Sequence, residues 1–420
     1  MNSLRRENEY DVIVIGSGTS GATIARELTR QQKKVLILER GANTPLKESF
    51  LTLASIVKEV PVSDKLSSMR AITTGGSSSI YAAIAELPPL DIFLSLDIDL
   101  SRELAEVQKE IPMAVLPDEL LGNQTIELRE SALKLGYQWQ KSLMLVDQSQ
   151  CDSGYSYEAK WKAKSYVTEA VAGGATLVNR AVVNKVLIEK NRATGVEYKI
   201  GNKISQAYGA QIVVAAGVLA TPIILRDSGV KNVANRGFYC NPGFLMFGTV
   251  AGLKGRDTFV GCMSADIGDD IVIGDANLPR TFYQIIMLAS LKFSRLFSFS
   301  NSMAVGVVVK DGLGGGLQKD GSYHKQLIQE EYKKLKKGEE VATKILKNAG
   351  AKNIFNTGID AGNVGGVLRI HEHLDENLQT EFNNLYVCDG SVIPENIRVY
   401  PTLTLICLAK YLAKHLLSRL

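Results

Sequence analysis

Continuous apolar runs and a helical segment alternate at the start of the chain. The runs Asp11–Ile15 and Lys34–Glu39 are apolar apart from their end residues. Runs of this kind are typical of parallel strands that are covered on both faces. Between them, residues 22–30 carry Ile24 and Leu28 at helical spacing. This order predicts a strand–helix–strand (βαβ) unit.

Similar elements follow further along the chain, and glycine, proline and asparagine mark the turns between them. The pattern predicts a helix over 160–172 and a buried strand over 210–216, with strands at 176–178, 182–188 and 195–200 between them, the last after a turn at 191–194. Strands alternate with Gly-rich turns from about 231 to 360, and a charged helix is predicted over 325–349. The C-terminal part returns to a strand at 384–388 and an apolar helix that opens at Pro401.

Composition excludes several classes of protein. The 420 residues are 45% hydrophobic and 22% charged, as in ordinary folded domains, and 48 Lys and Arg against 44 Asp and Glu leave a net charge of only +4. Such a small excess gives no nucleic-acid footprint. Five widely spaced cysteines without a CxxC pair indicate a reduced compartment, so we expect a cytoplasmic protein.

The two longest apolar stretches, 285–299 and 403–417, are each interrupted by two basic residues. Both fall short of the roughly 20 apolar residues that a spanning helix needs, so no transmembrane segment is predicted. The first stretch is compatible with a helix lying on a membrane surface. A core helix is the favoured interpretation.

A glycine-rich loop follows the first predicted strand. It reads Gly16-Ser17-Gly18-Thr19-Ser20-Gly21, and Glu39 lies 18 residues after its last glycine. The three glycines permit a tight turn, a close approach of the backbone to a pyrophosphate, and packing of the helix on the strand. A carboxylate at the end of the second strand accepts both ribose hydroxyls of an adenosine. The loop therefore predicts dinucleotide binding.

Three further motifs lie far apart in the sequence. They are Gly75-Gly76-Ser77-Ser78, the stretch Gly217–Val230 with Thr221-Pro222 in it, and the stretch Asn384–Pro394 followed by Pro401-Thr402-Leu403-Thr404. Together with the first loop and Glu39-Arg40-Gly41, they resemble the glucose-methanol-choline (GMC) oxidoreductase family. The second stretch departs from the family pattern at Val218 and Lys231, and the chain is similar in length to the family's compact members.

The resemblance implies an α/β fold. It consists of a Rossmann-like FAD-binding domain formed by residues 1–90, 151–230 and 361–420, and an α+β substrate domain on an antiparallel sheet formed by 91–150 and 231–360. FAD is the implied cofactor, and a helix that begins at Pro401 would direct partial positive charge at an anionic reduced flavin. By position, the implied FAD-binding residues are Gly16, Ser17, Gly18, Thr19, Ser20, Gly21, Glu39, Arg40, Gly75, Gly76, Ser77, Ser78, Val183, Ala216, Gly217, Asp389, Gly390, Thr402 and Leu403.

The family's usual active-site histidine and its partner are replaced. Asn363, in Gly362-Asn363-Val364-Gly365-Gly366, and Tyr400 occupy the two corresponding places and are the candidate catalytic residues. Asparagine does not titrate, and a tyrosine with a pKa of about 10 is protonated at neutral pH. Both still offer hydrogen bonds to a substrate oxygen.

Three interpretations of the activity stay open. The first is an oxidoreductase that moves hydride from a CH–OH carbon of a small or moderately apolar substrate to flavin N5, a dehydrogenase rather than an oxidase. The second is a non-redox lyase or isomerase in which Asn363, Arg398 and Tyr400 polarise the substrate. The third is a catalytically degenerate FAD-binding subunit.

Other titratable residues offer a relocated base. His371 and His373 are two residues apart and would share a face of a strand, while Glu395 follows Pro394. The histidines lack a third ligand at a fixed spacing, so no metal site is predicted. An exposed edge strand remains the simplest interpretation of the histidine pair.

Overall fold

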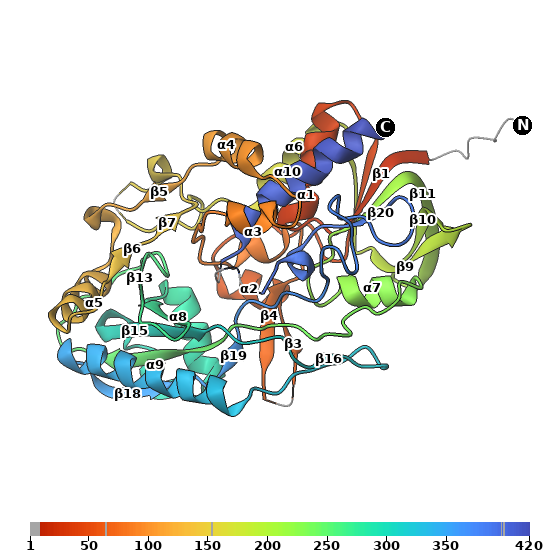
Figure 1. Ribbon diagram of the computed structural model, residues 1–420. Helices are drawn as coiled ribbons and strands as arrows, with labels where there is room; N and C mark the ends of the chain where they lie inside the picture. The colour runs from red at the N-terminus through yellow and green to blue at the C-terminus, as the bar shows by residue number, and fades with distance from the viewer. Residues whose placement is uncertain (1–8, 64, 153, 396, 398–399) are drawn as a thin grey trace, which may run out of the picture.

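The computed structural model describes residues 9–63, 65–152, 154–395, 397 and 400–420, and it contains two large sheets (Figure 1). The first has the strand order β8-β2-β1-β11-β10-β9, with β20 paired to β11. Its strands are β1 (Glu9–Ile15), β2 (Val35–Glu39), β8 (Thr176–Asn179), β9 (Val182–Glu189), β10 (Arg192–Ile200), β11 (Lys203–Val214) and β20 (Leu385–Val387).

Parallel pairing places β1 at the centre of the first sheet. Ile13 is in register with Leu36 on β2 and with Ile212 on β11. Strands β8 and β20 extend the parallel part, whereas β9, β10 and β11 form an antiparallel meander. The apolar residues of β1 and β2 are fully or almost fully buried, because both faces of these strands are covered. The βαβ prediction is confirmed.

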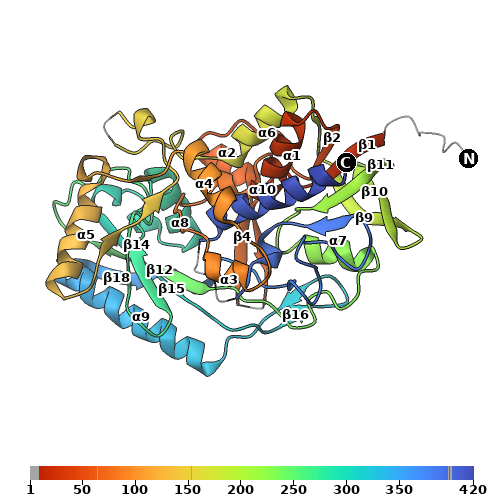
Figure 2. The ribbon, with the colours of Figure 1, turned by 45° about the horizontal axis from the view of Figure 1, so that its top comes forward.

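Three helices pack together against the first sheet (Figures 1 and 2). They are α1 (Thr19–Arg30), α6 (Ala163–Ala172) and α10 (Thr402–Ser418). Pro401 is the N-cap residue of α10, as its position before an apolar helical segment predicts. The C-terminal helix therefore lies beside the helix that follows the first glycine loop.

The second sheet is antiparallel and has the strand order β18-β12-β15-β14-β13-β6, with β19 paired to β12. Its strands are β6 (Gln140–Lys141), β12 (Pro242–Thr249), β13 (Met263–Asp266), β14 (Ile271–Asp275), β15 (Ser302–Val309), β18 (Lys352–Asn356) and β19 (Asp360–Ala361). The charged helix α9 (Gln329–Asn348) packs on this sheet so closely that a Cβ at Gly338 would lie 2.3 Å from Val307 Cγ1. Helix α5 (Asn123–Lys134) lies beside α9, and α8 (Arg280–Ala289) contacts β12 through the rings of Tyr283 and Phe247.

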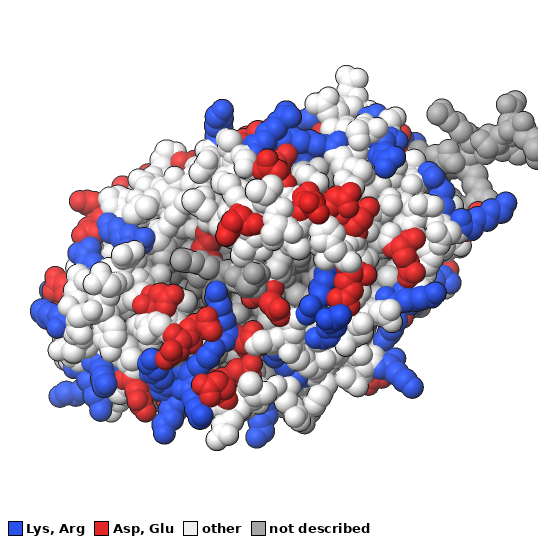
Figure 3. Space-filling model, in the orientation of Figure 1, with Lys and Arg blue, Asp and Glu red and all other residues white. Residues whose placement is uncertain are grey.

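Short elements lie outside the two large sheets. They are α2 (Phe50–Ile56), the hairpin β3 (Val57–Pro61) and β4 (Ser67–Ala71), α3 (Leu90–Leu94), α4 (Ser101–Glu110), the pair β5 (Ala114–Val115) and β7 (Leu143–Met144), α7 (Thr221–Asp227), and the pair β16 (Gly316–Leu317) and β17 (Tyr323–His324). None of the helices in the described ranges combines the length and apolar character needed to cross a bilayer. Acidic and basic side chains are interspersed on the face shown in Figure 3.

An ion network joins α4 to the helices of the first sheet. The Lys410 ammonium of α10 lies 2.9 Å from Glu110, 3.2 Å from Glu27 and 3.5 Å from Glu106, and its side chain is 2% exposed. Arg26 of α1 also binds Glu110, at 2.7 Å. Helix α4 belongs to the range 91–150 that was predicted for the substrate domain, yet it packs on α10. The domain boundaries stay a prediction.

Replacing Lys410 with methionine is expected to destabilise the protein by about 3 kcal/mol, because it leaves clustered carboxylates without their buried cation. Burial alone would lower the pKa of Lys410. The surrounding carboxylates raise this pKa by more, so the net shift is upward. Urea unfolding at pH 7 measures the effect.

The matched control is Lys414→Met, since Lys414 pairs with Glu103 and Glu106 but is 34% exposed. For this variant we expect the unfolding free energy to fall by less than about 1 kcal/mol. Burial raises the pKa values of Glu106 and Glu110. Lys414 and Lys410 lower the pKa of Glu106 by more, and Arg26 and Lys410 lower that of Glu110 by more, so both net shifts are downward. The stabilisation is therefore fully present above the ordinary carboxyl pKa range and is lost as the pH falls through the lowered pKa values. Equal losses in the two variants would contradict this account.

Candidate functional site

The first glycine loop connects β1 to α1. Gly16 has φ +100°, and a Cβ there would lie 2.3 Å from the Ala215 carbonyl oxygen. A Cβ at Gly21 would lie 2.1 Å from the Gly16 oxygen, so both glycines are required by backbone packing. A Cβ at Gly18 would meet nothing within 4 Å. One glycine of the three therefore faces open space.

Open space at Gly18 coincides with the start of α1. Gly18 is the N-cap residue of this 12-residue helix and provides no side-chain cap. The first N–H groups of a helix have no partner within the helix, and they carry partial positive charge. An anionic group placed against Gly18 would accept from them. The loop fits a pyrophosphate, which is the part of FAD that the sequence predicts here.

Glu39 ends β2 and is buried. Its Oε2 accepts hydrogen bonds from Ser17 N at 3.0 Å and Ser17 Oγ at 2.6 Å, and its Oε1 accepts from Gly41 N at 2.6 Å. The carboxylate thereby fixes the glycine loop to the end of β2. Arg40, in contrast, is exposed. Oε2 already accepts two hydrogen bonds, whereas Oε1 accepts one and retains lone-pair capacity for a ribose hydroxyl.

The second glycine loop touches the first. Ser17 Oγ accepts from Gly75 N at 3.2 Å, and a Cβ at Gly76 would lie 3.0 Å from Gly18 Cα. Ser78 Oγ donates to Gly75 O at 2.6 Å and accepts from Ala163 N, the first residue of α6. Gly75 and Gly76 both have positive φ. Residues 58 positions apart in the sequence thus share one loop surface.

Asp389 connects two further motifs. Its Oδ2 accepts from Gly217 N at 2.8 Å and from Thr221 Oγ1, and its Oδ1 accepts from Ser391 N at 2.9 Å and Ser391 Oγ at 2.6 Å. The Asp389 side chain is buried, and both of its oxygens are used in hydrogen bonds that hold the two backbone segments together. A Cβ at Gly217, which has φ +90°, would meet nothing within 4 Å. Gly217 therefore offers an open backbone surface like that at Gly18.

Asn363 lies on a segment that runs beside the Asp389 motif. Leu368 N donates to Ser391 O at 2.9 Å, and the Val364 oxygen lies 3.7 Å from the position of a Cβ at Gly390. On the other side, Tyr239 and Gly365 exchange two backbone hydrogen bonds of 3.1 Å. The structure therefore brings the predicted Asn363 region next to the C-terminal motif.

Tyr400 lies two residues before the start of α10. Its backbone N–H donates to Glu86 Oε2 at 3.2 Å. Burial of the hydroxyl raises the pKa of Tyr400 to about 12, and the Glu86 charge adds to the rise. The Tyr400 hydroxyl is therefore protonated at physiological pH and is able to donate a hydrogen bond. Glu86 is a carboxylate beside this candidate residue that sequence reasoning missed, because nothing in the pattern around residue 86 distinguishes it.

Several other predicted residues have different surroundings. His371 and His373 lie in a turn rather than on an edge strand, because His371 has φ +67° and ends the extended backbone. His373 Nδ1 accepts from Arg369 N, and its Nε2 contacts Asn232 O at 3.1 Å, so the ring closes a turn. His371 lies 3.5 Å from Asp97. Glu395 is exposed, and Arg398 lies outside the described residues.

The remaining predicted FAD-binding residues are spread over the same end of the first sheet. Val183 is buried on β9, and the backbone N–H of Ala181, two residues earlier, donates to the backbone carbonyl oxygen of Glu39 at 2.9 Å. Leu403 is fully buried, whereas Thr402 and Ala216 are partly exposed. No group of three or more potential metal ligands occurs in the part of the chain that the structure describes.

A cluster around Lys160 was not predicted. The Lys160 ammonium donates to Tyr81 O at 3.3 Å and lies 5.0 Å from the Tyr157 ring centre, while Tyr157 donates to Ser79 O at 2.8 Å. Burial lowers the pKa of Lys160 to about 8. The cluster supports the second glycine loop from the side of α6. No sequence pattern predicts this cluster, because residues up to 79 positions apart in the chain come into contact only in the folded protein.

Comparison with known proteins agrees with these motifs. Residues 97–262 match the family model "GMC oxidoreductase", and residues 14–44 match "NAD(P)-binding Rossmann-like domain". An uncharacterised protein of Methanocaldococcus jannaschii is 26% identical over 97% of this chain and 100% of its own length. Oxygen-dependent choline dehydrogenase of Pseudomonas fluorescens is 24% identical over 53% of this chain and 48% of that protein.

A solved structure has the same fold over nearly the whole length. Pyridoxine 4-oxidase from Mesorbium loti superposes with a TM-score of 0.74 at 14% identity, over 97% of this chain and 99% of that one. The fold is a Rossmann-like α/β domain combined with an α+β part on an antiparallel sheet, as the sequence predicts. The motifs, the match of residues 97–262 to the family model and the named relatives together support assignment of this chain to the GMC oxidoreductase family, with FAD as the cofactor.

Proposed function

We propose that the protein is an FAD-dependent oxidoreductase that acts on a CH–OH carbon of a small or moderately apolar substrate. The observation that carries the proposal is the pair of open backbone surfaces at Gly18 and Gly217, the second of which is joined to the Asn363 region through Asp389. Bound FAD would supply, at its N5 atom, the acceptor for the hydride. The family to which the chain is assigned supports the same chemistry.

The residues of this chain would bind and orient the substrate hydroxyl. We propose that Asn363 and the protonated Tyr400 hydroxyl hydrogen-bond the substrate oxygen. Neither accepts a proton at neutral pH, since an amide does not titrate and the pKa of Tyr400 is about 12. The carboxylate of Glu86, beside Tyr400, is the proton acceptor that we propose for the hydroxyl.

The visible spectrum and anaerobic flavin reduction test the proposal. We expect a yellow protein whose flavin bleaches on anaerobic mixing with a substrate alcohol. Tyr400→Phe and Asn363→Ala should each slow the bleaching about 10²-fold, as the loss of one oriented hydrogen-bond donor does. Glu86→Gln removes the proposed proton acceptor and should slow the bleaching by about 10²- to 10⁴-fold, as the loss of a general base does.

Three results would contradict the proposal. A colourless protein that takes up no added FAD overturns the flavin chemistry. Turnover without bleaching and without an electron acceptor indicates a lyase or isomerase instead. Unchanged bleaching in both Tyr400→Phe and Asn363→Ala shows that these residues do not contact the substrate.

A further inference from the structure

The loop that follows α8 exposes three large apolar side chains within seven residues. Leu291 is 73% exposed, Phe293 58% and Phe297 92%. This loop belongs to the stretch 285–299, for which a core helix is the favoured interpretation. Only Tyr283 and Met287 of α8 are buried, and the helix ends at Ala289, so the core-helix prediction is wrong. Clustered apolar exposure of this kind marks an interaction surface.

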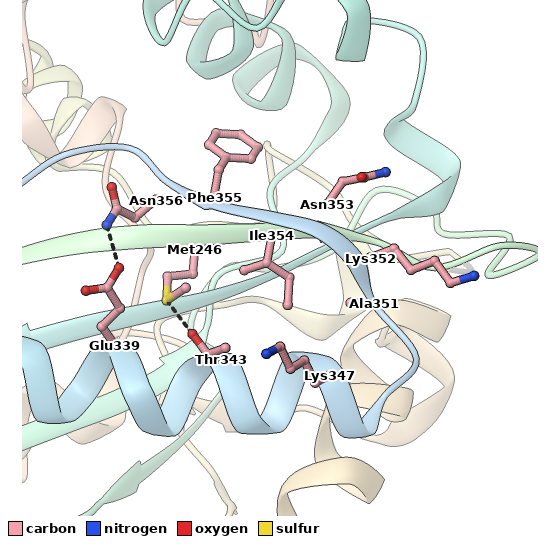
Figure 4. A pocket seen from close by; sticks show the side chains of 10 residues that line it. All are labelled: Met246, Glu339, Thr343, Lys347, Ala351, Lys352, Asn353, Ile354, Phe355 and Asn356. Atoms are coloured by element: carbon pink, nitrogen blue, oxygen red, sulfur yellow. Dashed lines mark hydrogen bonds between the residues drawn. The ribbon is translucent and has the colours of Figure 1, made fainter.

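Hydrogen bonds and ring contacts hold the loop in this conformation. Tyr283 Oη donates to Arg295 O at 2.7 Å, and Arg295 Nη2 donates to Asn353 O, on β18, at 2.7 Å. The Phe355 ring lies 5.0 Å from Lys292 Nζ and 4.8 Å from the Arg295 guanidinium. Figure 4 shows Phe355 on the side of β18 that faces away from α9. The loop that carries the exposed apolar side chains is therefore held against β18 by Lys292 and Arg295.

The sequence segment that contains the loop carries basic residues and no acidic residue. Residues 276–310 contain Arg280, Lys292, Arg295 and Lys310 and no acidic residue. The neighbouring segment 341–359 carries Lys344, Lys347 and Lys352, again without an Asp or Glu. Two carboxylates border this region: Asp257 accepts from Arg280 N, and Glu339 lines the far end of a hollow of about 550 Å³ between α9 and β18. The whole chain has a net charge of only +4, so this region is a local concentration.

We propose that residues 291–297 dock the protein on the surface of an anionic lipid bilayer. Leu291, Phe293 and Phe297 would enter the interface, while Lys292, Arg295 and Lys352 contact the anionic headgroups. Apolar burial and attraction of basic residues to the surface act together in such binding. A second copy of the chain is a poorer occupant, because a two-fold contact would place the same cations opposite each other. The inference does not rest on the proposed chemistry.

Vesicle sedimentation tests the proposal. The probes are large vesicles of phosphatidylcholine alone and of phosphatidylcholine with about one third phosphatidylglycerol. We expect binding to the anionic vesicles only. The triple change Leu291→Ser, Phe293→Ser and Phe297→Ser should weaken it at least tenfold. The matched control is Leu94→Ser with Ile204→Ser, at two side chains that are 63% and 62% exposed elsewhere, and it should bind as the parent does.

Two further measurements distinguish insertion of the side chains into the bilayer from adsorption on its surface and from self-association of the protein. A single Phe297→Trp variant should be quenched by brominated lipid, which shows that the side chain enters the bilayer. Light scattering in the absence of lipid reports the oligomeric state of the parent and triple variants. Absence of binding to anionic vesicles, binding unaffected by the triple change, or a triple change that dissolves a dimer without altering lipid binding would each overturn the proposal.

Discussion

Replacing Gly18 with alanine is expected to abolish tight FAD binding while leaving the apoprotein as stable as the parent. Gly18 has φ −69° and ψ −168°, a conformation that alanine adopts freely, and a Cβ there meets nothing within 4 Å. With FAD bound, the added methyl group would occupy the place of the pyrophosphate. We expect the Kd for FAD to rise about 10²-fold, equivalent to about 3 kcal/mol. Fluorescence titration of the apoprotein measures it.

Gly21→Ala is the matched control, because it adds the same methyl group on the opposite side of the loop. There the Cβ would lie 2.1 Å from the Gly16 oxygen, so the apoprotein itself should lose about 3 kcal/mol of unfolding free energy. The two variants separate cofactor contact from loop packing. If Gly18→Ala retains the affinity of the parent, the open surface at Gly18 does not hold the pyrophosphate.

Asp389→Ala is expected to have the largest effect on stability among the motif residues. It removes the acceptor for Gly217 N, Ser391 N and two hydroxyl groups inside the protein. Leaving two buried backbone N–H groups without an acceptor costs about 4 kcal/mol. Chemical unfolding of the apoprotein at pH 7 measures this loss, which does not depend on the cofactor.

Asp389→Asn and Ser391→Ala serve as graded controls. The amide keeps one acceptor oxygen, so we expect a loss of about 2 kcal/mol, and removing the Ser391 hydroxyl alone should cost about 1 kcal/mol. An Asp389→Ala protein within 1 kcal/mol of the parent would show that Asp389 does not hold the two motifs together.

Local patterns predicted the elements of the first sheet well. The continuous apolar runs at β1 and β2 are buried on both faces, which is why their composition announces parallel strands. Boundaries were less accurate. Strand β11 extends from Lys203 to Val214 rather than over 210–216, because its exposed half pairs with β10 and needs no apolar run.

The histidine pair shows where local reasoning fails. A spacing of two residues indicates a shared face only on a strand, and residues 371–374 form a turn. The left-handed conformation of His371 and the hydrogen bonds of His373 depend on Asn232 and Arg369, which the spacing does not reveal.

The sequence by itself determined the nucleotide-binding loop, its acidic residue Glu39 and the family motifs, because each depends on residues that are close together in the chain or on glycines whose backbone requirements are local. Only the tertiary structure decided which motifs meet: Ser17 with Gly75, Asp389 with Gly217, and Tyr400 with Glu86. It also decided that Leu291, Phe293 and Phe297 remain exposed rather than joining the core. Contacts between residues up to 314 positions apart follow from sheet order and helix packing, which no local pattern contains.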